Sequence, residues 1–297
     1  TTGASFVLIN VGVGVQLRDL IIANNGDTGS ANGVSFSNSA RVLVDRCVVH
    51  SVRGSGFAAT SGQFTLVQCE VYAANQSNTA NTPAVAITGT GLGALIRCMI
   101  HDNTGSNTDG ARLGGGFGFL TCVDTVFDTN GRHGILAAST VNVTVVNCTF
   151  HGNGTDGINT SAQANVYAEN CIFTSNTTTG VAASSAANGR LIFIRSAAYN
   201  GNGSPTTNVP AEQSASAVTL SGDPFVDAAN GDFDLDNTSG EGAACRSAGV
   251  GEYMQTASSY AGTLSFPDIG AVQHTDGGGG GGSASVLRPV PQSGGLV

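Results

Sequence analysis

The chain has 297 residues, a formal net charge of −9, 43 glycines and no tryptophan, and its eleven strong bases are all arginine. So few bases provide no basic stripe for a nucleic-acid backbone, and no apolar run has the length of a bilayer span. The many short polar residues and scarce helix-favouring charged residues indicate short strands joined by tight turns.

A repeat of 22 to 29 residues extends from about residue 5 to residue 205. Its reference position, called position 0, is mostly cysteine, and the residues two positions later and three and five positions earlier are mostly apolar. Position 0 is occupied by Leu20, Cys47, Cys69, Cys98, Thr125, Cys148, Cys171 and Ser196. Position +2 is occupied by Ile22, Val49, Val71, Ile100, Phe127, Phe150, Phe173 and Ala198.

The phase of these apolar columns predicts a corner within each repeat. Positions −5 and −3 share one side of a strand, as do positions 0 and +2, but the step from −3 to 0 is odd. All four side chains point inward only if the chain bends between the two pairs. A third short strand follows Gly33, Gly56, Ala84, Gly110, Gly134, Gly157 and Gly180. Three strands per turn predict an all-β parallel β-helix, about eight turns and roughly 40 Å long.

Two polar columns have structural interpretations. Asparagine stands at position +5 in five turns, namely at Asn25, Asn103, Asn130, Asn153 and Asn176. Asparagine tolerates left-handed turns and stacked amides bond to one another, so these residues predict a turn ladder. Cysteines on adjacent turns would have Cβ atoms about 4.8 Å apart, beyond disulfide range. We therefore expect buried free thiols, and the missing Cys-x₂-Cys spacing argues against structural zinc.

The repeat, in segments such as residues 145–158, resembles the parallel β-helix proteins of the pectin-lyase-like superfamily. Residues 223–235 and 267–273 resemble the segment that closes such helices in bacterial surface proteins and phage structural proteins. The resemblance implies a right-handed parallel β-helix over residues 1–205, a small irregular or β closing region over 206–275, and a Gly-rich linker with a docking tail over 276–297. The family includes lyases, hydrolases, adhesins and phage tail spikes, so it leaves the function open.

Position +3 holds the candidate binding residues. His101, Asp128 and His151 occupy this position on consecutive turns and are candidate ligands for a metal or a sugar hydroxyl. The alternative interpretation, which we favour, is a corner that accepts polar residues, because two histidines and one aspartate in line rarely form a coordination sphere. The sequence thus predicts no metal and no cofactor.

Catalytic signatures are weak. The resemblance implies that a lyase of this fold would gather carboxylates for calcium beside an Arg or Lys base, but the acids here occupy different positions in their turns. A hydrolase needs two carboxylates about 5–9.5 Å apart, and Asp102 with Asp128 or Asp109 is the best available pair. We therefore predict a protein that is not an enzyme, with a polysaccharide lyase or hydrolase as the enzymatic alternative.

The C-terminal sequence predicts an assembly device. Residues 277–282 are six glycines, which form a flexible linker, and the short apolar peptide behind them folds only against a partner. The residues expected to dock are Val286, Leu287, Arg288, Pro289, Val290 and Pro291.

These features together favour a structural subunit of an extracellular assembly. The leading hypothesis is a phage virion protein (tail, spike, fibre or capsid-decorating protein) whose β-helix projects as a rod and whose tail anchors. The alternative is a secreted bacterial surface β-helix protein that binds carbohydrate, or a polysaccharide lyase. Expected partners are other copies or other proteins of the assembly, with polysaccharide as a further candidate and without nucleic acid or membrane insertion. The expected location is the virion or the extracellular surface.

Overall fold

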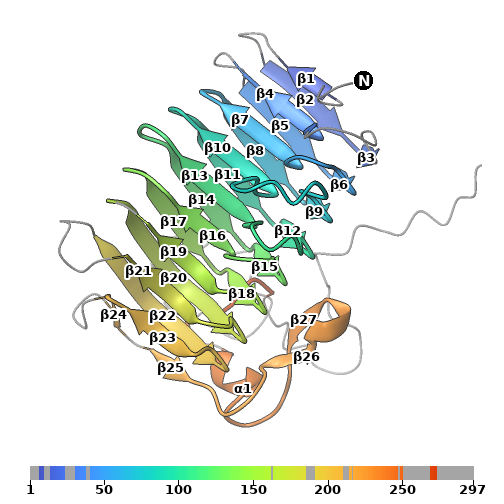
Figure 1. Ribbon diagram of the computed structural model, residues 1–297. Coiled ribbons are helices and arrows are strands. Elements are labelled where there is room, and N and C mark those ends of the chain that lie inside the picture. The colour runs from blue at the N-terminus through green and yellow to red at the C-terminus, as the bar shows by residue number, and fades with distance from the viewer. Residues whose placement is uncertain are drawn as a thin grey trace, which may run out of the picture.

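The computed structural model describes residues 7–9, 14–23, 31–37, 41–161, 163–184, 191–209, 214–215, 217–246, 248–249 and 268–272. Parallel strands wind into a β-helix whose turns stack into a rod (Figure 1). Helical structure in these ranges is limited to the short α1 (Gly242–Cys245) and one 3₁₀ turn (Ala228–Asn230). None of the described residues forms a helix long and apolar enough to cross a membrane.

Each turn contributes strands to three faces of the rod. The first face stacks β2 (Gly14–Arg18), β5 (Arg41–Asp45), β8 (Gln63–Val67), β11 (Leu92–Ile96), β14 (Phe119–Val123), β17 (Asn142–Val146) and the first halves of β20 (Asn165–Thr174) and β22 (Ile192–Asn200). The second face stacks β3 (Ile21–Ala23), β6 (Val48–His50), β9 (Glu70–Tyr72), β12 (Met99–His101), β15 (Val126–Asp128), β18 (Thr149–His151) and the second halves of β20 and β22.

The third face closes the triangle. It stacks β1 (Val7–Ile9), β4 (Val34–Phe36), β7 (Phe57–Thr60), β10 (Val85–Thr88), β13 (Ala111–Gly114), β16 (Ile135–Ala137), β19 (Asp156–Thr160), β21 (Thr179–Ala183) and β23 (Ser204–Thr207). A glycine precedes most of these strands because the turns approach closely there. At Gly134, for example, an added Cβ would lie 2.6 Å from the carbonyl oxygen of Gly157 on the next turn.

The corner between the first and second faces is one left-handed residue at position −1. Arg97 has φ 54°, Asp124 φ 50° and Asn147 φ 49°. This bend returns position 0 to the interior, as the phase of the columns predicted. The position 0 side chain also donates to the backbone beside this bend and on the preceding turn: the Cys98 thiol lies 3.5 Å from the carbonyl oxygen of Ile96 and 3.4 Å from that of Leu66. A small donor such as Cys or Thr therefore suits this column.

The predicted interior columns are confirmed. Phe127, Phe150 and Phe173 are fully buried and stack on one another, with ring centroids 5.1 and 5.0 Å apart. All seven cysteines are free and buried, and burial raises the pKa of the Cys122 thiol well above its usual value. The rod is therefore filled by side chains and encloses six of these thiols, while Cys245 lies in α1 of the closing region.

The last turn differs from the prediction by one residue. Ile192 pairs with Val166 and Ala197 with Cys171, so Ala197 occupies position 0 in place of Ser196. In this segment both the odd-numbered and the even-numbered positions include apolar residues. The sequence pattern alone therefore fits a register with either Ser196 or Ala197 at position 0. The structure adopts the register that stacks Tyr199 on Phe173 at 5.4 Å.

The asparagine ladder forms, but its members are not the left-handed residues. Asn103, Asn130, Asn153 and Asn176 bond side chain to side chain along the rod, and Asn202 extends the ladder by one turn. The left-handed residue is the one before each, for example Asp102 with φ 50°. Asn25 lies outside the described residues.

The closing region packs against the outer side of the second face. After β24 (Ser214–Ala215) and β25 (Val218–Thr219), the chain forms the antiparallel pair β26 (Phe225–Asp227) and β27 (Asp232–Leu235) beside the C-terminal turns (Figure 1). A second apolar core joins this region to the rod; its buried members are Val126, Ile172, Ala198, Leu220, Phe225, Ala228, Phe233, Leu235, Cys245, Ile269 and Ala271. The docking residues Val286 to Pro291 lie outside the described residues.

Candidate functional site

The three candidate binding residues share one column on the second face. His101 ends β12, Asp128 ends β15 and His151 ends β18, and each pairs with the next across the parallel strands. The spacing of the repeat therefore placed them correctly. Their hydrogen bonds, however, divide them into two separate groups.

His101 is held by two carboxylates. Its Nε2 lies 2.9 Å from Glu70 Oε1 on the preceding turn, and its Nδ1 lies 2.8 Å from Asp102 Oδ2. Burial is the largest single influence and lowers the pKa of the imidazole, but the hydrogen bonds and charges of the two acids outweigh it and raise that pKa. Both ring nitrogens are engaged, which leaves no lone pair directed at a ligand.

The imidazole of His101 also belongs to a stack of rings. Tyr72 lies 5.3 Å from His101 and 4.8 Å from His50, ring centroid to ring centroid. Burial, followed by the charge of Glu70, raises the pKa of Tyr72. Because the rings cover one another along the rod, they present mainly edges to solvent, which is a poor platform for a sugar ring.

Asp128 and His151 form the second group. Asp128 Oδ1 lies 2.7 Å from His151 Nδ1 and accepts a hydrogen bond from Thr129 Oγ1 at 2.8 Å. The closing region covers this pair, since Phe225 and Phe233 meet the His151 ring edge-on at 5.9 and 5.7 Å. The pair fastens the closing region to the rod and is largely removed from solvent.

The acids considered for hydrolysis are also engaged by bases. Asp109 is fully buried and receives two hydrogen bonds from Arg132, at 2.8 and 2.6 Å. Asp102 and Asp128 bond to His101 and His151. A carboxylate held in this way is already paired, so these contacts favour structural roles for all three acids.

Sequence reasoning missed the base partners, although the repeat carried the signal. Arg132 follows Asp109 by 23 residues, and Asp156 follows His133 by the same interval, one turn of this part of the rod. His133 Nδ1 lies 3.1 Å from Asp156 Oδ2, which also accepts from Asn159 Nδ2 at 2.7 Å. Burial is the largest influence on the pKa of Asp156 and raises it, but these hydrogen bonds together lower it below its usual value.

Asp124, at the corner between the first and second faces, also has a base beside it. Asp124 lies 3.7 Å from Arg97 at the first corner, and burial raises its pKa. Within the described ranges, no group of three or more His, Cys, Asp or Glu side chains is arranged to hold a metal ion. The three column residues are thus aligned but do not form a coordination sphere.

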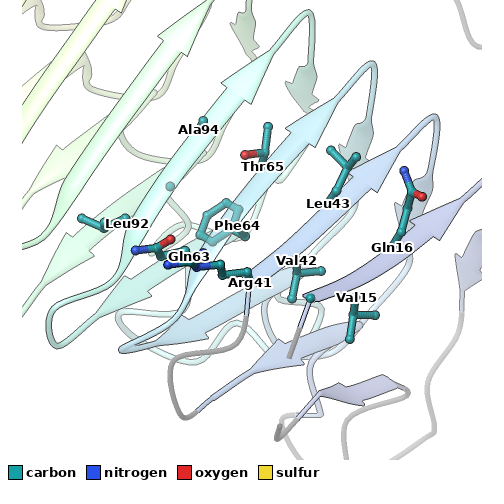
Figure 2. Close-up of a pocket in the computed structure, with 12 residues that line it drawn as sticks. Val15, Gln16, Arg41, Val42, Leu43, Gln63, Phe64, Thr65, Leu92 and Ala94 are labelled. Carbon is teal, nitrogen blue, oxygen red and sulfur yellow. The ribbon is translucent and has the colours of Figure 1, made fainter. Parts of the chain in front are cut away.

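A hollow of about 610 Å³ lies on the first face, across β2, β5, β8 and β11 (Figure 2). Arg41, Gln63 and Leu92, at position −6, form one wall, and the outward residues at position −4 form the other. The backbone at position −5 forms the floor, where Phe64 is buried. The lining holds one cation and no acid or histidine, so it is suited to binding and not to acid–base chemistry.

Sequence reasoning had no means of finding this hollow. The residue types at the outward positions of a strand follow no regular apolar pattern. The hollow arises from small or flexible side chains, such as Thr65 and Ala94, on neighbouring turns. Only the stacking of four turns brings these residues together.

Comparison with known proteins places the fold. A family model described as "Right handed beta helix region" matches residues 5–195 and 83–240. The match and the parallel strand order together confirm the predicted right-handed parallel β-helix. No curated protein matches the chain.

Two solved structures are similar to this chain. The crystal structure of pectate lyase Pel9A is 14% identical with a TM-score of 0.51, over 93% of this chain and 84% of that chain. The crystal structure of bacteriophage CBA120 tailspike protein 3 is 14% identical with a TM-score of 0.34, over 71% of this chain and 47% of that chain. At 14% identity, the likeness to pectate lyase Pel9A shows a shared fold.

Proposed function

The chain belongs to the right-handed β-helix family, and on that basis we propose that it is a structural subunit of an extracellular assembly, foremost a phage virion. In this role the β-helix is the projecting rod. The virion or the extracellular surface is then its place of action.

One observation carries this proposal: the ionic side chains join adjacent turns to one another. Arg132 reaches back to Asp109 at 2.6 Å, and Arg97 reaches forward to Asp124 at 3.7 Å. Among the residues that the structure describes, the other pairs between turns are Arg18–Asp45, Arg46–Asp19, His101–Glu70, His133–Asp156, His151–Asp128 and Arg195–Glu169. Charges used in this way support the cohesion of a rod and leave few for catalysis.

The cysteines favour the virion over the secreted alternative. Seven free, buried thiols suit a chain that folds in a reducing cytoplasm, as phage proteins do. Secreted proteins more often bridge their cysteines. The proposed partners are other copies or other proteins of the assembly, with the tail residues Val286 to Pro291 as the anchor.

A carbohydrate-binding surface protein is the second candidate, and the first-face hollow favours it. Arg41, Gln16 and Gln63 in its lining offer hydrogen-bonding groups of the kind that recognise sugars. Because the chain shares its fold with pectate lyase Pel9A, a polysaccharide lyase is the enzymatic alternative within this second candidate function.

An activity assay tests the proposal. The purified chain is incubated with polygalacturonate and with alginate, with and without calcium, and unsaturated products are followed by ultraviolet absorbance. We expect no product, while a known pectate lyase in parallel produces it. Product formation that increases with the concentration of this chain would replace the structural role by a lyase.

Deletion of the tail tests the anchor. A chain lacking residues 277–297 should melt at the same temperature as the full chain but fail to appear in purified particles. Full incorporation of the truncated chain would rule out the tail as the anchor.

A further inference from the structure

The outward side of the first face is unusually apolar for a solvent-facing surface. Among the described residues, large hydrophobic side chains exposed on this face are Leu92 at 36%, Phe119 at 48%, Leu191 at 66% and Phe193 at 39%. They lie at positions −6 and −4 of their turns. Apolar area gathered on one flat face indicates an interaction surface.

The same face is uncharged over its four central turns. The exposed and half-buried outward residues there are Gln63, Thr65, Val67, Leu92, Ala94, Ile96, Phe119, Thr121, Asn142 and Thr144. A chain with net charge −9 repels its own copies over most of its surface. Two copies approach without that repulsion where both present this face.

The two halves of the face differ in relief. The half formed by β2, β5, β8 and β11 contains the hollow of about 610 Å³ (Figure 2). The half formed by β14, β17, β20 and β22 carries protruding rings: Phe119 is half-exposed, and Tyr167 stacks on Phe193 at 5.6 Å. A surface with a hollow in one half and projections in the other is complementary to itself when reversed.

We propose that the first face is the contact of an antiparallel homodimer. Its two-fold axis runs along the strand direction, midway between β11 and β14, so that the hollow half of each copy receives the ring-bearing half of the other. Such an isologous contact makes every pairing occur twice. A parallel arrangement of the rods would instead place hollow on hollow and rings on rings.

The sequence of the face fits this axis. Leu92 of one copy then faces Phe119 of the other, so large apolar side chains meet at position −6. On the next turns outward, Thr65 faces Thr144, so hydroxyls meet at position −4. The parallel register of β8, β11, β14 and β17 aligns these residues along the rod, so their levels relative to the axis are known.

The charges at the two ends of the face are already paired within each copy. Arg18 and Asp45 lie 3.3 Å apart at one end, and Glu169 and Arg195 lie 4.0 Å apart at the other. On the proposed axis β2 faces β22 and β5 faces β20, so Arg18 lies opposite Arg195 and Asp45 opposite Glu169. These like charges oppose the contact, but each has its counter-ion in the same copy, and both carboxylates are buried.

The area suffices for a reversible dimer. Five-residue strands are about 17 Å long and eight strands span about 34 Å, which gives roughly 600 Å² on each copy. The total of roughly 1,200 Å² lies at the lower limit for specific interfaces. The dimer is therefore expected to dissociate on dilution.

The inference rests on the proposed function in one respect, because it names a second copy of this chain as a partner in the assembly. Site-specific cross-linking tests it with the full chain. Thr65→Cys and Thr144→Cys are made separately, and disulfide-linked dimers are sought after mild oxidation of each variant alone and of their mixture. The native thiols are buried and remain unreactive.

The expected result is a cross-linked dimer in the mixture and in neither variant alone, since Thr65 meets Thr144 across the axis. Ala86→Cys, on the third face, is the matched control and should not cross-link. Dimers from each variant alone would indicate parallel rods and overturn the antiparallel contact. Absence of any cross-link, with a monomer at all concentrations in sedimentation, would overturn the interface itself.

A charge placed on the face provides a second readout. Phe119→Asp should shift the full chain to monomer at concentrations where the unchanged chain dimerises, with an unchanged circular dichroism spectrum. Val226→Asp, at an exposed site on the closing region, should leave the dimer intact. If the unchanged chain were monomeric, the dimer contact would be refuted but the proposed structural role would not. If the chain had lyase activity, the structural role would be refuted, and a cross-linked dimer would still support the contact.

Discussion

The side-chain amide of Asn130 donates to Asn153 Oδ1 over 3.0 Å, and that of Asn153 donates to Asn176 Oδ1 over 2.8 Å. Each amide also donates to a backbone carbonyl of the preceding turn, as Asn153 does to Phe127 at 3.1 Å. The ladder is buried, and its polar atoms are satisfied by one another and by the bends they hold. Replacing one asparagine of the ladder would leave buried polar groups without hydrogen-bond partners, and the free-energy cost of those unpaired groups is the main contribution of the ladder to stability.

Asn153→Ala should therefore lower the free energy of unfolding by about 2–4 kcal/mol. It removes the acceptor of the backbone N–H and of one side-chain N–H of Asn130, and the side-chain donor to the Phe127 carbonyl, all in the interior. Urea unfolding followed by circular dichroism measures the loss. Asn142→Ala is the matched control, since Asn165 donates to Asn142 at 2.9 Å in a similar pair at the surface. Equal losses in the two variants would refute the role of burial.

The ladder and the interior columns were predictable because stacking repeats the same position in space. Phe150 and Asn153 recur at fixed offsets from Cys148, and a constant turn length puts each above its counterpart. The fate of His151 was not predictable. Its cover comes from Phe225 and Phe233, which belong to no repeat and whose docking depends on tertiary contacts alone.

Phe150→Ala should lower the free energy of unfolding by about 3–5 kcal/mol, the usual loss for a buried phenylalanine. Phe127 and Phe173 hold its ring on both sides, so the cavity has little room to collapse. Urea unfolding of the variant measures this loss. Phe117→Ala, at a ring that is 68% exposed, is the control and should change the same free energy by under about 1 kcal/mol.

His101 should make stability depend on pH. Its pKa is raised in the folded chain by Glu70 and Asp102, against the opposing effect of burial. A raised pKa contributes stability that is fully present below the unfolded value, about 6.5, and is lost as the pH rises through the folded value. The free energy of unfolding should therefore fall across that window.

Urea unfolding at a series of pH values, for the unchanged chain and for His101→Asn, isolates this contribution. The variant should lack the part of the decrease that His101 provides, and Glu70→Gln should shift the decrease to lower pH because one of the two acids is lost. An identical pH dependence in all three proteins would assign the effect to other groups.

The closing region should detach from the rod in part when its aromatic contacts are removed. Phe233 is buried, packs edge-on against Phe225 at 5.1 Å and meets the ring of His151. Phe233→Ala removes a contact between the rod and the closing region but none within the rod, where the columns and the asparagine ladder hold the turns. Stability should therefore decrease locally, as happens where a segment is joined through a separate core.

Modification of histidines with diethyl pyrocarbonate, read by mass spectrometry, should show faster reaction at His151 and an unchanged rate at His101. Val226→Ala, on the exposed side of β26, should leave both rates unchanged. If the reactivity of both histidines instead increased together with a loss of the whole circular dichroism signal, the rod and its closing region would unfold as one unit, and the second core would be part of the stability of the rod itself.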